Sequence, residues 1–375
     1  MIYLDNASTT KLTPEVFSAM EPFLKESYGN PSSHHSLGEK ARKAIDESRE
    51  IIASVINCKP QEIYFTSGGS EANTWAIKGL NHSGKRCFFI SSKQEHHSIL
   101  NALKTFSPYD VYYLDSDNYG VIDTESVRDK SFYGVTLCTI QTVNNETGII
   151  QPIQKLAFKC KDDGCIFHTD AVQAFGYLKL DVDQLGVDML SASAHKIHGP
   201  KGVGFLYISD RIKDQMCPLI NGGQQERGLR GSTENVAGIV GFGRAALIAN
   251  QNMSKNFEYT KNLGIEFVNM LSHLPGVHTN VNLTDTDFRH ISIRLDGIRA
   301  EEMLALLDSV HICVSSGSAC NSDSKEPSHV LKAIGLSDKE ANSTIRVSLN
   351  ETNTLQELKE FISYLEVFLT TLRRK

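Results

Sequence analysis

Short apolar runs alternate with amphipathic segments along most of the chain. Runs rich in Val, Ile and Phe predict strands, whereas apolar positions spaced three and four residues apart predict helices. We expect strands at residues 63–66, 88–91, 111–114, 135–140, 165–169, 189–192, 203–208, 291–295 and 345–349. Because helical segments separate many of these runs, the pattern predicts an α/β layered fold with a largely parallel sheet.

Two signals mark helix starts near the N-terminus. Thr13 precedes Pro14, and proline suits the first helical position because its missing N–H would have no partner there. Ser36 and Glu39 have the spacing of a capping box, which predicts a helix from Ser36 to about Asn57.

The pattern changes in the second half of the chain. Residues 235–273 predict two long helices or one broken helix, after which strands and helices alternate again. We therefore place a domain boundary near residue 250. The predicted domains are a large one at residues 14–250 and a smaller one made of residues 1–13 and 251–375.

Composition excludes several classes of protein. The 375 residues include 38 basic and 44 acidic side chains, so the net charge is −6, and 40% of the residues are hydrophobic. This mild acidity argues against direct binding to nucleic acid or to an anionic membrane surface, and the apolar content argues against disorder. No stretch approaches the roughly 20 apolar residues of a membrane span. Because the N-terminus has no secretory pattern, we expect a cytoplasmic protein.

The eight cysteines include no CxxC pair. In a cytoplasmic chain this spacing predicts reduced thiols and no zinc site, so no bound metal is expected. Cys87 and Cys138 lie in apolar runs and are expected in the core. Cys320 differs, because it lies in the Ser/Gly-rich stretch 314–322, which predicts an exposed loop in the smaller domain.

Three motifs follow predicted strands, at the edge where α/β sheets bind ligands. Lys196 lies in a glycine-rich turn, where partial desolvation would make its amine nucleophilic, although a lone lysine in a turn is usually a surface residue. The turn at residues 67–73 begins a helix whose N–H groups would bind phosphate with Ser67 or Ser70. Asp170 would either pair with a buried cation or cap a helix. An amine, a phosphate cradle and an aspartate are together what pyridoxal phosphate requires.

Arg346 lies within a strand-like run. A buried guanidinium there would need an anionic partner, and a substrate carboxylate held by two hydrogen bonds is a natural one. At a sheet edge the same arginine would be an ordinary surface residue.

The chain resembles the cysteine desulfurases of the NifS/IscS type in the class-V aminotransferase family. The resemblance spans nearly the whole chain and rests on ten blocks in a fixed order: YLDN, GNPSS, SGGSEAN, EH, VNNETG, HTDAVQ, SAHKIHGPKG, LRGSTEN, SSGSACNS and IRVSL. It implies the fold type I of pyridoxal-phosphate enzymes, in which helices flank the mostly parallel sheet of a large domain and a smaller α/β domain follows. It also implies a homodimer.

The resemblance implies roles for individual residues. Lys196 would hold pyridoxal phosphate as a Schiff base, His96 would stack on its ring and act in acid–base steps, and Asp170 would pair with the ring nitrogen. Cys320 would be the nucleophile, and Arg346 would clamp the substrate carboxylate. The other implied contacts are Gln173 and Asn145 at the ring hydroxyl or substrate, Gly69, Ser70, Ser193 and His195 at the phosphate, and Thr233 at the phosphate of the neighbouring subunit.

The implied reaction converts L-cysteine to L-alanine and leaves a persulfide on Cys320 for an acceptor protein. The acceptor would serve either iron–sulfur cluster assembly or the thiolation of tRNA or a cofactor. The chain ends at Lys375, where some family members continue with a tail that docks the iron–sulfur scaffold, so both acceptors stay open. Because His96 and His97 are adjacent, we expect only one of them in the site.

Three alternatives remain. A related lyase or aminotransferase would use another amino acid, such as selenocysteine, although a simple aminotransferase needs no thiol. A non-catalytic scaffold protein would have no need for this set of reactive side chains. A Cys/His metal protein would need ligand spacing that the chain lacks.

Overall fold

The computed structural model describes residues 1–375 except 81–85, 125–131, 133, 318–325 and 374–375. In the described part, a seven-stranded sheet has the order β2-β8-β7-β6-β5-β3-β4, and β8 alone runs antiparallel to its neighbours. Its strands are β2 (Ile63–Thr66), β3 (Phe89–Ser92), β4 (Val111–Leu114), β5 (Leu137–Thr139), β6 (Ile166–Asp170), β7 (Met189–Ser193) and β8 (Gly204–Ile208). The predicted α/β fold with a mostly parallel sheet is confirmed.

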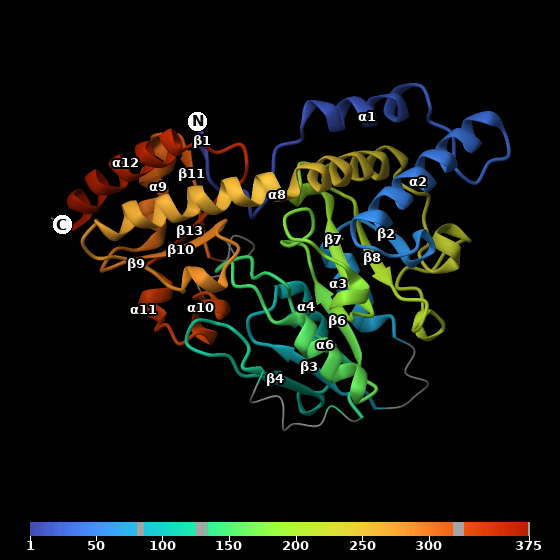
Figure 1. The fold of residues 1–375 in the computed structure, drawn as a ribbon, viewed down its shortest axis with the longest axis horizontal. Coiled ribbons are helices and arrows are strands. Elements are labelled where there is room, and N and C mark those ends of the chain that lie inside the picture. The colour runs from blue at the N-terminus through green and yellow to red at the C-terminus, as the bar shows by residue number, and fades with distance from the viewer. Residues whose placement is uncertain (81–85, 125–131, 133, 318–325, 374–375) are drawn as a thin grey trace.

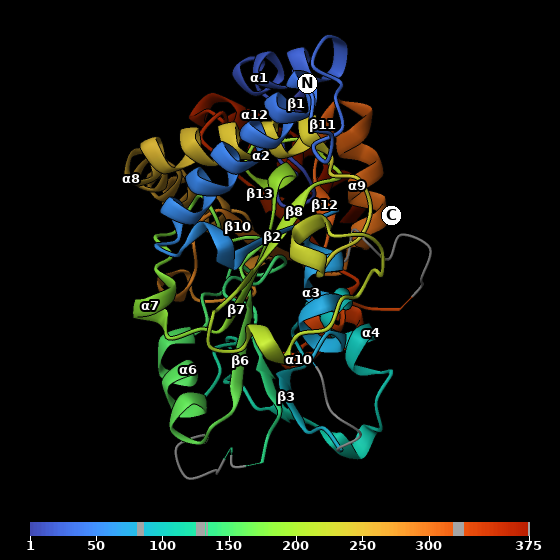
Figure 2. The same cartoon turned by 90° about the vertical axis from the view of Figure 1, so that its right-hand side faces the viewer.

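Both faces of this sheet are covered by helices. In β8, Phe205 and Tyr207 belong to one apolar core, whereas Leu206 and Ile208 belong to another. Strands buried on both faces read as continuous apolar runs, which is why they were recognisable in the sequence. The covering helices include α3 (Gly69–Lys78), α4 (His97–Leu103), α6 (Ile153–Asp162) and α7 (Val182–Leu185). Figure 2 shows α6 and α3 on opposite sides of β6 and β7.

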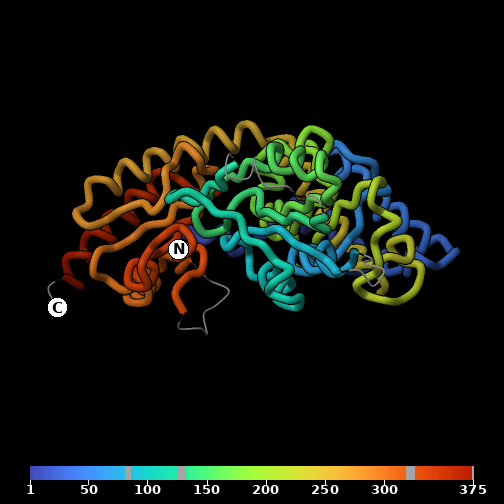
Figure 3. Tube along the Cα trace, turned by 90° about the horizontal axis from the view of Figure 1, so that it is seen from below, coloured from blue at the N-terminus to red at the C-terminus, as the bar shows by residue number. Residues whose placement is uncertain are grey.

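A second, antiparallel sheet has its own apolar core. Its order is β12-β13-β10-β9. The strands are β9 (Val277–Thr279), β10 (His290–Leu295), β12 (Ser315–Ser316) and β13 (Thr344–Ser348), and the nearby helices are α9 (Ala300–Ser309), α10 (His329–Ala333), α11 (Asp338–Ala341) and α12 (Leu355–Arg373). The N-terminal strand β1 (Ile2–Tyr3) pairs with β11 (Ile312–Cys313), so the chain begins beside this sheet (Figure 3).

One long helix connects the two sheets. The segment expected as two helices or a broken one is the continuous helix α8 (Val236–Ser272), whose 37 residues run along the molecule in Figure 1. The predicted boundary at residue 250 falls in its interior, and the division of the chain there stays a prediction. Helices α1 (Pro14–Lys25) and α2 (Ser36–Val55) pack against α8. The expected capping box at Ser36 is wrong, because His35 is the N-cap and accepts from the Gly38 N–H.

The cysteine pattern is partly as expected. Cys87 and Cys138 are buried, whereas Cys217 is exposed. Exposure therefore does not distinguish Cys320 from all the other cysteines, as the sequence had suggested. Cys320 itself lies outside the described residues. Among the helices that are described, none is both long enough and apolar enough to cross a membrane.

A buried ion pair joins α2 to the turn before α8. The Arg49 guanidinium donates two hydrogen bonds of 2.8 Å to Glu226, which also accepts from the backbone N–H of Phe65. Arg49 is 8% exposed and Glu226 is 5% exposed. Because desolvation makes an unpaired buried carboxylate costly, the two side chains depend on each other.

Replacing Arg49→Met should lower the free energy of unfolding by about 3–5 kcal/mol, because it leaves the Glu226 carboxylate buried without its cation. Urea denaturation measures the loss. Arg299→Met is the matched control, since Arg299 pairs with Glu301 on the surface, where ion pairs contribute little. Equal midpoints for Arg49→Met and the parent would contradict the prediction.

Candidate active site

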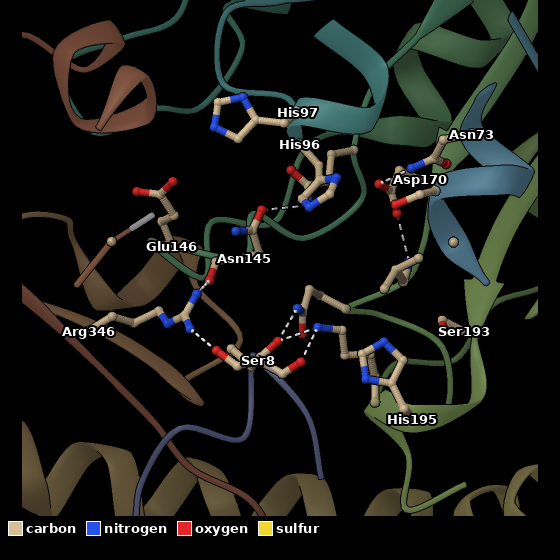
Figure 4. Close-up of a pocket in the computed structure, with 18 of the residues that line it drawn as sticks. Ser8, Asn73, His96, His97, Asn145, Glu146, Asp170, Ser193, His195 and Arg346 are labelled. Atoms are coloured by element: carbon tan, nitrogen blue, oxygen red, sulfur yellow. Dashed lines mark hydrogen bonds between the residues drawn. The ribbon is translucent and has the colours of Figure 1, made fainter. Parts of the chain in front are cut away.

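A cavity of about 330 Å³ lies where the strand ends of the main sheet face the second sheet. Asp170 ends β6 and Ser193 ends β7, while Gly69 begins the helix after β2. Arg346 of β13 lines the opposite wall (Figure 4). Ligands of open α/β sheets bind at such an edge, because loops and helix starts converge there.

The Asp170 carboxylate is held from two sides. Asn73 Nδ2 donates to its Oδ2 at 2.7 Å, and the Val172 N–H donates to its Oδ1 at 3.0 Å. Asp170 is 2% exposed. The carboxylate is thus a fixed acceptor facing the cavity, suited to a cationic N–H group of a ligand.

Lys196 ends a short turn after β7, and its amine points across the cavity to the N-terminal segment. Nζ donates to the carbonyl oxygens of Ala7 at 2.5 Å and Ser8 at 2.9 Å. These two carbonyl acceptors fix the direction of the amine.

The two histidines beside Lys196 are held in the neutral form. Burial is the main cause that lowers the pKa of His195 to about 4, and the nearby Lys196 ammonium adds to it. Burial also lowers the pKa of His96, where Asp170 opposes the effect. The Ser98 N–H donates to His96 Nδ1, so the ring hydrogen belongs on Nε2.

The start of α3 forms a cradle beside this cavity. A Cβ on Gly69 would lie 2.6 Å from Val172 Cγ2, so only glycine fits without moving that neighbour. Ser70, Ser193 and His195 line the same opening. The first N–H groups of a helix have no partners within it, and the helix dipole favours an anion there.

Arg346 is buried and already hydrogen-bonded. Its guanidinium donates to the Asn145 carbonyl oxygen, to Asp5 Oδ1 and to Ser8 Oγ, each at 2.8 Å. Its Nε has no partner among the described residues. The side chain is 3% exposed, so its direction is fixed by these contacts.

The structure places most of the expected residues in one cavity. Ten of the twelve line it: Gly69, Ser70, His96, Asn145, Asp170, Gln173, Ser193, His195, Lys196 and Arg346. Thr233 instead lines a separate cavity of about 220 Å³. Cys320 lies outside the described residues, although Gly317 lines the main cavity.

Sequence reasoning missed other residues at the site. Both His96 and His97 line the cavity, so the expectation that only one would do so is wrong: His96 is the N-cap of α4 and His97 is its first residue. Ser8, Glu146 and His329 line it as well. Glu146 lies in the block VNNETG, but nothing in that block indicates that burial raises its pKa to about 7.

Residues 2–361 match the aminotransferase class-V family. The chain belongs to this family. It is 42% identical to the cysteine desulfurase IscS of Dictyoglomus turgidum, over 99% of this chain and 95% of that protein. The structure of a NifS-like protein superposes with a TM-score of 0.92 and 34% identity over 99% of both chains. The structure of SspA in complex with cysteine has a TM-score of 0.82 and 37% identity, over 93% of this chain and 99% of that one.

Enzymes of this class-V family use pyridoxal phosphate, and the cavity fits that group. An amine, a buried carboxylate and a glycine cradle at a helix start are arranged around one space. The Oδ1 atom of Asn73 and the Oε1 atom of Gln141 are buried there without partners in the part of the chain that is described. Such atoms indicate a polar ligand, because buried acceptors are normally satisfied.

Glu95 is the buried acid next to His96. Burial raises the pKa of Glu95 to about 8, and its Oε2 has no hydrogen-bond partner in the described chain. The folded protein therefore keeps a proton that the unfolded chain releases near pH 4–5. The contribution of Glu95 to the free energy of unfolding therefore falls as pH rises from about 5 to 8, and it is constant at higher pH.

Replacing Glu95→Gln should remove this decrease in the free energy of unfolding between pH 5 and pH 8, because the amide does not ionise. At about 1.4 kcal/mol per pKa unit, the decrease amounts to up to a few kcal/mol. Urea midpoints at pH 5 and pH 8 measure it, with the exposed Glu360→Gln as the control. The same pH dependence in Glu95→Gln and in the parent would show that Glu95 ionises normally.

Proposed function

We propose that the chain is a pyridoxal-phosphate-dependent cysteine desulfurase. The observation that carries this proposal is the joint arrangement of the Lys196 amine, the buried Asp170 carboxylate and the glycine cradle at Gly69 around one cavity. The similarity to cysteine desulfurases over nearly the whole chain supports it. It takes L-cysteine as substrate and leaves L-alanine.

Several residues would hold the cofactor. Lys196 would carry it as a Schiff base, and Asp170 would accept a hydrogen bond from the ring nitrogen. His96 would lie against the ring. The phosphate would lie at Gly69, Ser70, Ser193 and His195, and the ring hydroxyl at Gln173 and Asn145. When bound, pyridoxal phosphate supplies an electron sink for the bonds at the substrate Cα.

The protein supplies positioning and proton transfer. Once released, the Lys196 amine would move the proton at the substrate Cα, and neutral His96 would donate or accept one nearby. Arg346 would bind the substrate carboxylate through its free Nε–H and by exchanging its contact with Ser8 or Asp5 for the substrate.

Cys320 would then take the sulfur. Its thiolate would attack the substrate sulfur, so an S–S bond forms and the C–S bond breaks, leaving alanine and a persulfide on the enzyme. The persulfide would pass to an acceptor protein of iron–sulfur cluster assembly or of tRNA or cofactor thiolation.

We place the enzyme in the cytoplasm as a homodimer, in which Thr233 reaches the phosphate in the neighbouring subunit. The large domain at residues 14–250 would hold the cofactor, and the remainder would carry Cys320.

Substituting Lys196→Ala should abolish the yellow absorbance band near ~420 nm that a lysine Schiff base of pyridoxal phosphate gives. Absorbance of the purified protein, before and after added cofactor, checks this. Lys179→Ala, at an exposed lysine, is the matched control and should stay yellow. A parent protein that stays colourless with added cofactor would refute the proposed function.

Substituting Cys320→Ala should abolish sulfide release from L-cysteine in the presence of a reductant, while the yellow band remains, because only the sulfur acceptor is lost. Cys217→Ala is the control, since Cys217 is an exposed free thiol outside the cavity. Mass spectrometry of cysteine-treated parent protein should add about 32 Da, one sulfur atom, to Cys320. Sulfide release at the parent rate by Cys320→Ala would rule out the persulfide step.

A further inference from the structure

Three charged or ionisable residues lie buried where β10 begins in the second sheet. His290 Nδ1 lies 2.8 Å from Asp287 Oδ2 and 3.0 Å from Asp287 Oδ1. The Arg289 guanidinium lies 2.8 Å from Asp287 Oδ2. Asp287, Arg289 and His290 are 0%, 4% and 1% exposed. Burial alone would raise the pKa of Asp287, but His290 and Arg289 hold it below its usual range, so Asp287 is ionised.

Two residues of this cluster contact Gln173, which follows β6 of the main sheet and lines the active-site cavity. His290 Nε2 lies 3.2 Å from Gln173 Oε1, and Arg289 donates to the Gln173 carbonyl oxygen at 2.6 Å. On its other side, Gln173 Nε2 donates to the Ala7 carbonyl oxygen at 3.0 Å. Because a carbonyl oxygen can only accept, the amide nitrogen must face Ala7 and the amide oxygen must face His290.

The same reasoning fixes the hydrogens of His290. Both of its partners, the Asp287 carboxylate and Gln173 Oε1, are acceptors, so the contacts are satisfied when both ring nitrogens carry hydrogen. The net effect on the pKa of His290 is a lowering, because burial outweighs the Asp287 carboxylate, so the second ring hydrogen depends on these two hydrogen bonds and not on a raised pKa. Without the Nε2 hydrogen, the ring nitrogen and Gln173 Oε1 would face each other as two buried acceptors.

The path continues to Lys196. The Ala7 carbonyl oxygen that accepts from Gln173 also accepts from Lys196 Nζ. A second route leads there as well: Arg289 stacks 3.5 Å over the Tyr177 ring, and the Tyr177 hydroxyl donates to the Lys196 carbonyl oxygen at 3.2 Å. Every link is a packed contact among described residues.

We propose that Asp287 and His290 are positioning residues that orient the Gln173 amide and, through the Ala7 carbonyl oxygen, the Lys196 amine. The inference rests on the proposed function, because it assigns Gln173 and Lys196 to the cofactor site. Asp287 holds the imidazole, the imidazole donates to Gln173, and the amide is then kept from rotating away from the cavity.

The test combines four variants of the full-length chain: His290→Leu, His290→Gln, Gln173→Leu and the double variant. Titration of each apoprotein with pyridoxal phosphate, followed by absorbance, gives the dissociation constant. His290→Leu should weaken binding about fivefold, as loss of one hydrogen bond does, whereas His290→Gln should stay within about twofold because its amide N–H reaches the same acceptor. In the Gln173→Leu background, His290→Leu should have no further effect.

His278→Leu is the matched control, since His278 pairs with Asp296 at 2.8 Å on the surface of the same sheet. A fivefold loss that persists in the Gln173→Leu background, or a His290→Gln variant as weak as His290→Leu, would overturn the proposal. Should His290→Leu fail to fold, the comparison of His290→Gln with the parent and the NMR of the parent still decide the matter.

Nitrogen-15 NMR of the apoprotein tests the hydrogen bonds without any cofactor. Two exchange-protected imidazole N–H signals from His290 are expected; both should be lost in His290→Leu, which assigns them, and the Nε2–H signal should shift in Gln173→Leu. Absence of an Nε2–H signal in the parent would overturn the inference. A parent that shows both signals yet binds no pyridoxal phosphate would refute the proposed function and leave the positioning of Gln173 intact.

Discussion

The position of the Ala7 carbonyl oxygen is the constraint on which the site depends. It accepts hydrogen bonds from Lys196 and from Gln173, which follow different strands of the main sheet. Its neighbour Ser8 accepts from Lys196 and from Arg346. The segment can do this because β1 pairs with β11 and Asp5 bridges to β13, so the N-terminus is fixed to the second sheet before it crosses to the first. The backbone carbonyl groups of this segment thus link side chains of both sheets.

The strands of the main sheet were predictable because burial on both faces makes them continuous apolar runs. The runs at 63–66 and 111–114 match β2 and β4 to the residue, and the others differ by one or two positions. The short strands β1, β9, β11 and β12 were missed, since two or three residues carry no periodicity. The unity of α8 was missed for a different reason: its first half is rich in glycine and alanine, and its second half is amphipathic, so the pattern alone resembles two helices.

The candidate site was predictable where one motif carries the chemistry. Lys196, Asp170 and the turn at Gly69 each lie in a short block whose residue types indicate a ligand group. The contacts that orient them were not, because they join residues 166 positions apart for Gln173 and Ala7, and 341 apart for Arg346 and Asp5. A local sequence pattern cannot indicate a contact between residues so far apart in the chain. Asp287 and His290 were missed for the same reason, since a polar pair before a strand is typical of a surface turn.

The placement of the charges around the cavity, and not their sum, determines which ligand it suits. Lys196 and Arg346 bring two positive charges to the cavity, which Asp170 and Asp5 offset. Burial reduces the charge of other ionisable groups at the site, because it lowers the pKa of His96 and His195 and raises the pKa of Glu95 to about 8 and that of Glu146 to about 7. Neutral imidazoles and a protonated Glu95 can exchange hydrogen bonds with a ligand but do not repel or neutralise it. A ligand that brings a phosphate to the helix start and a carboxylate to Arg346 would place each anionic group beside hydrogen-bond donors, while Asp170 meets its cationic centre.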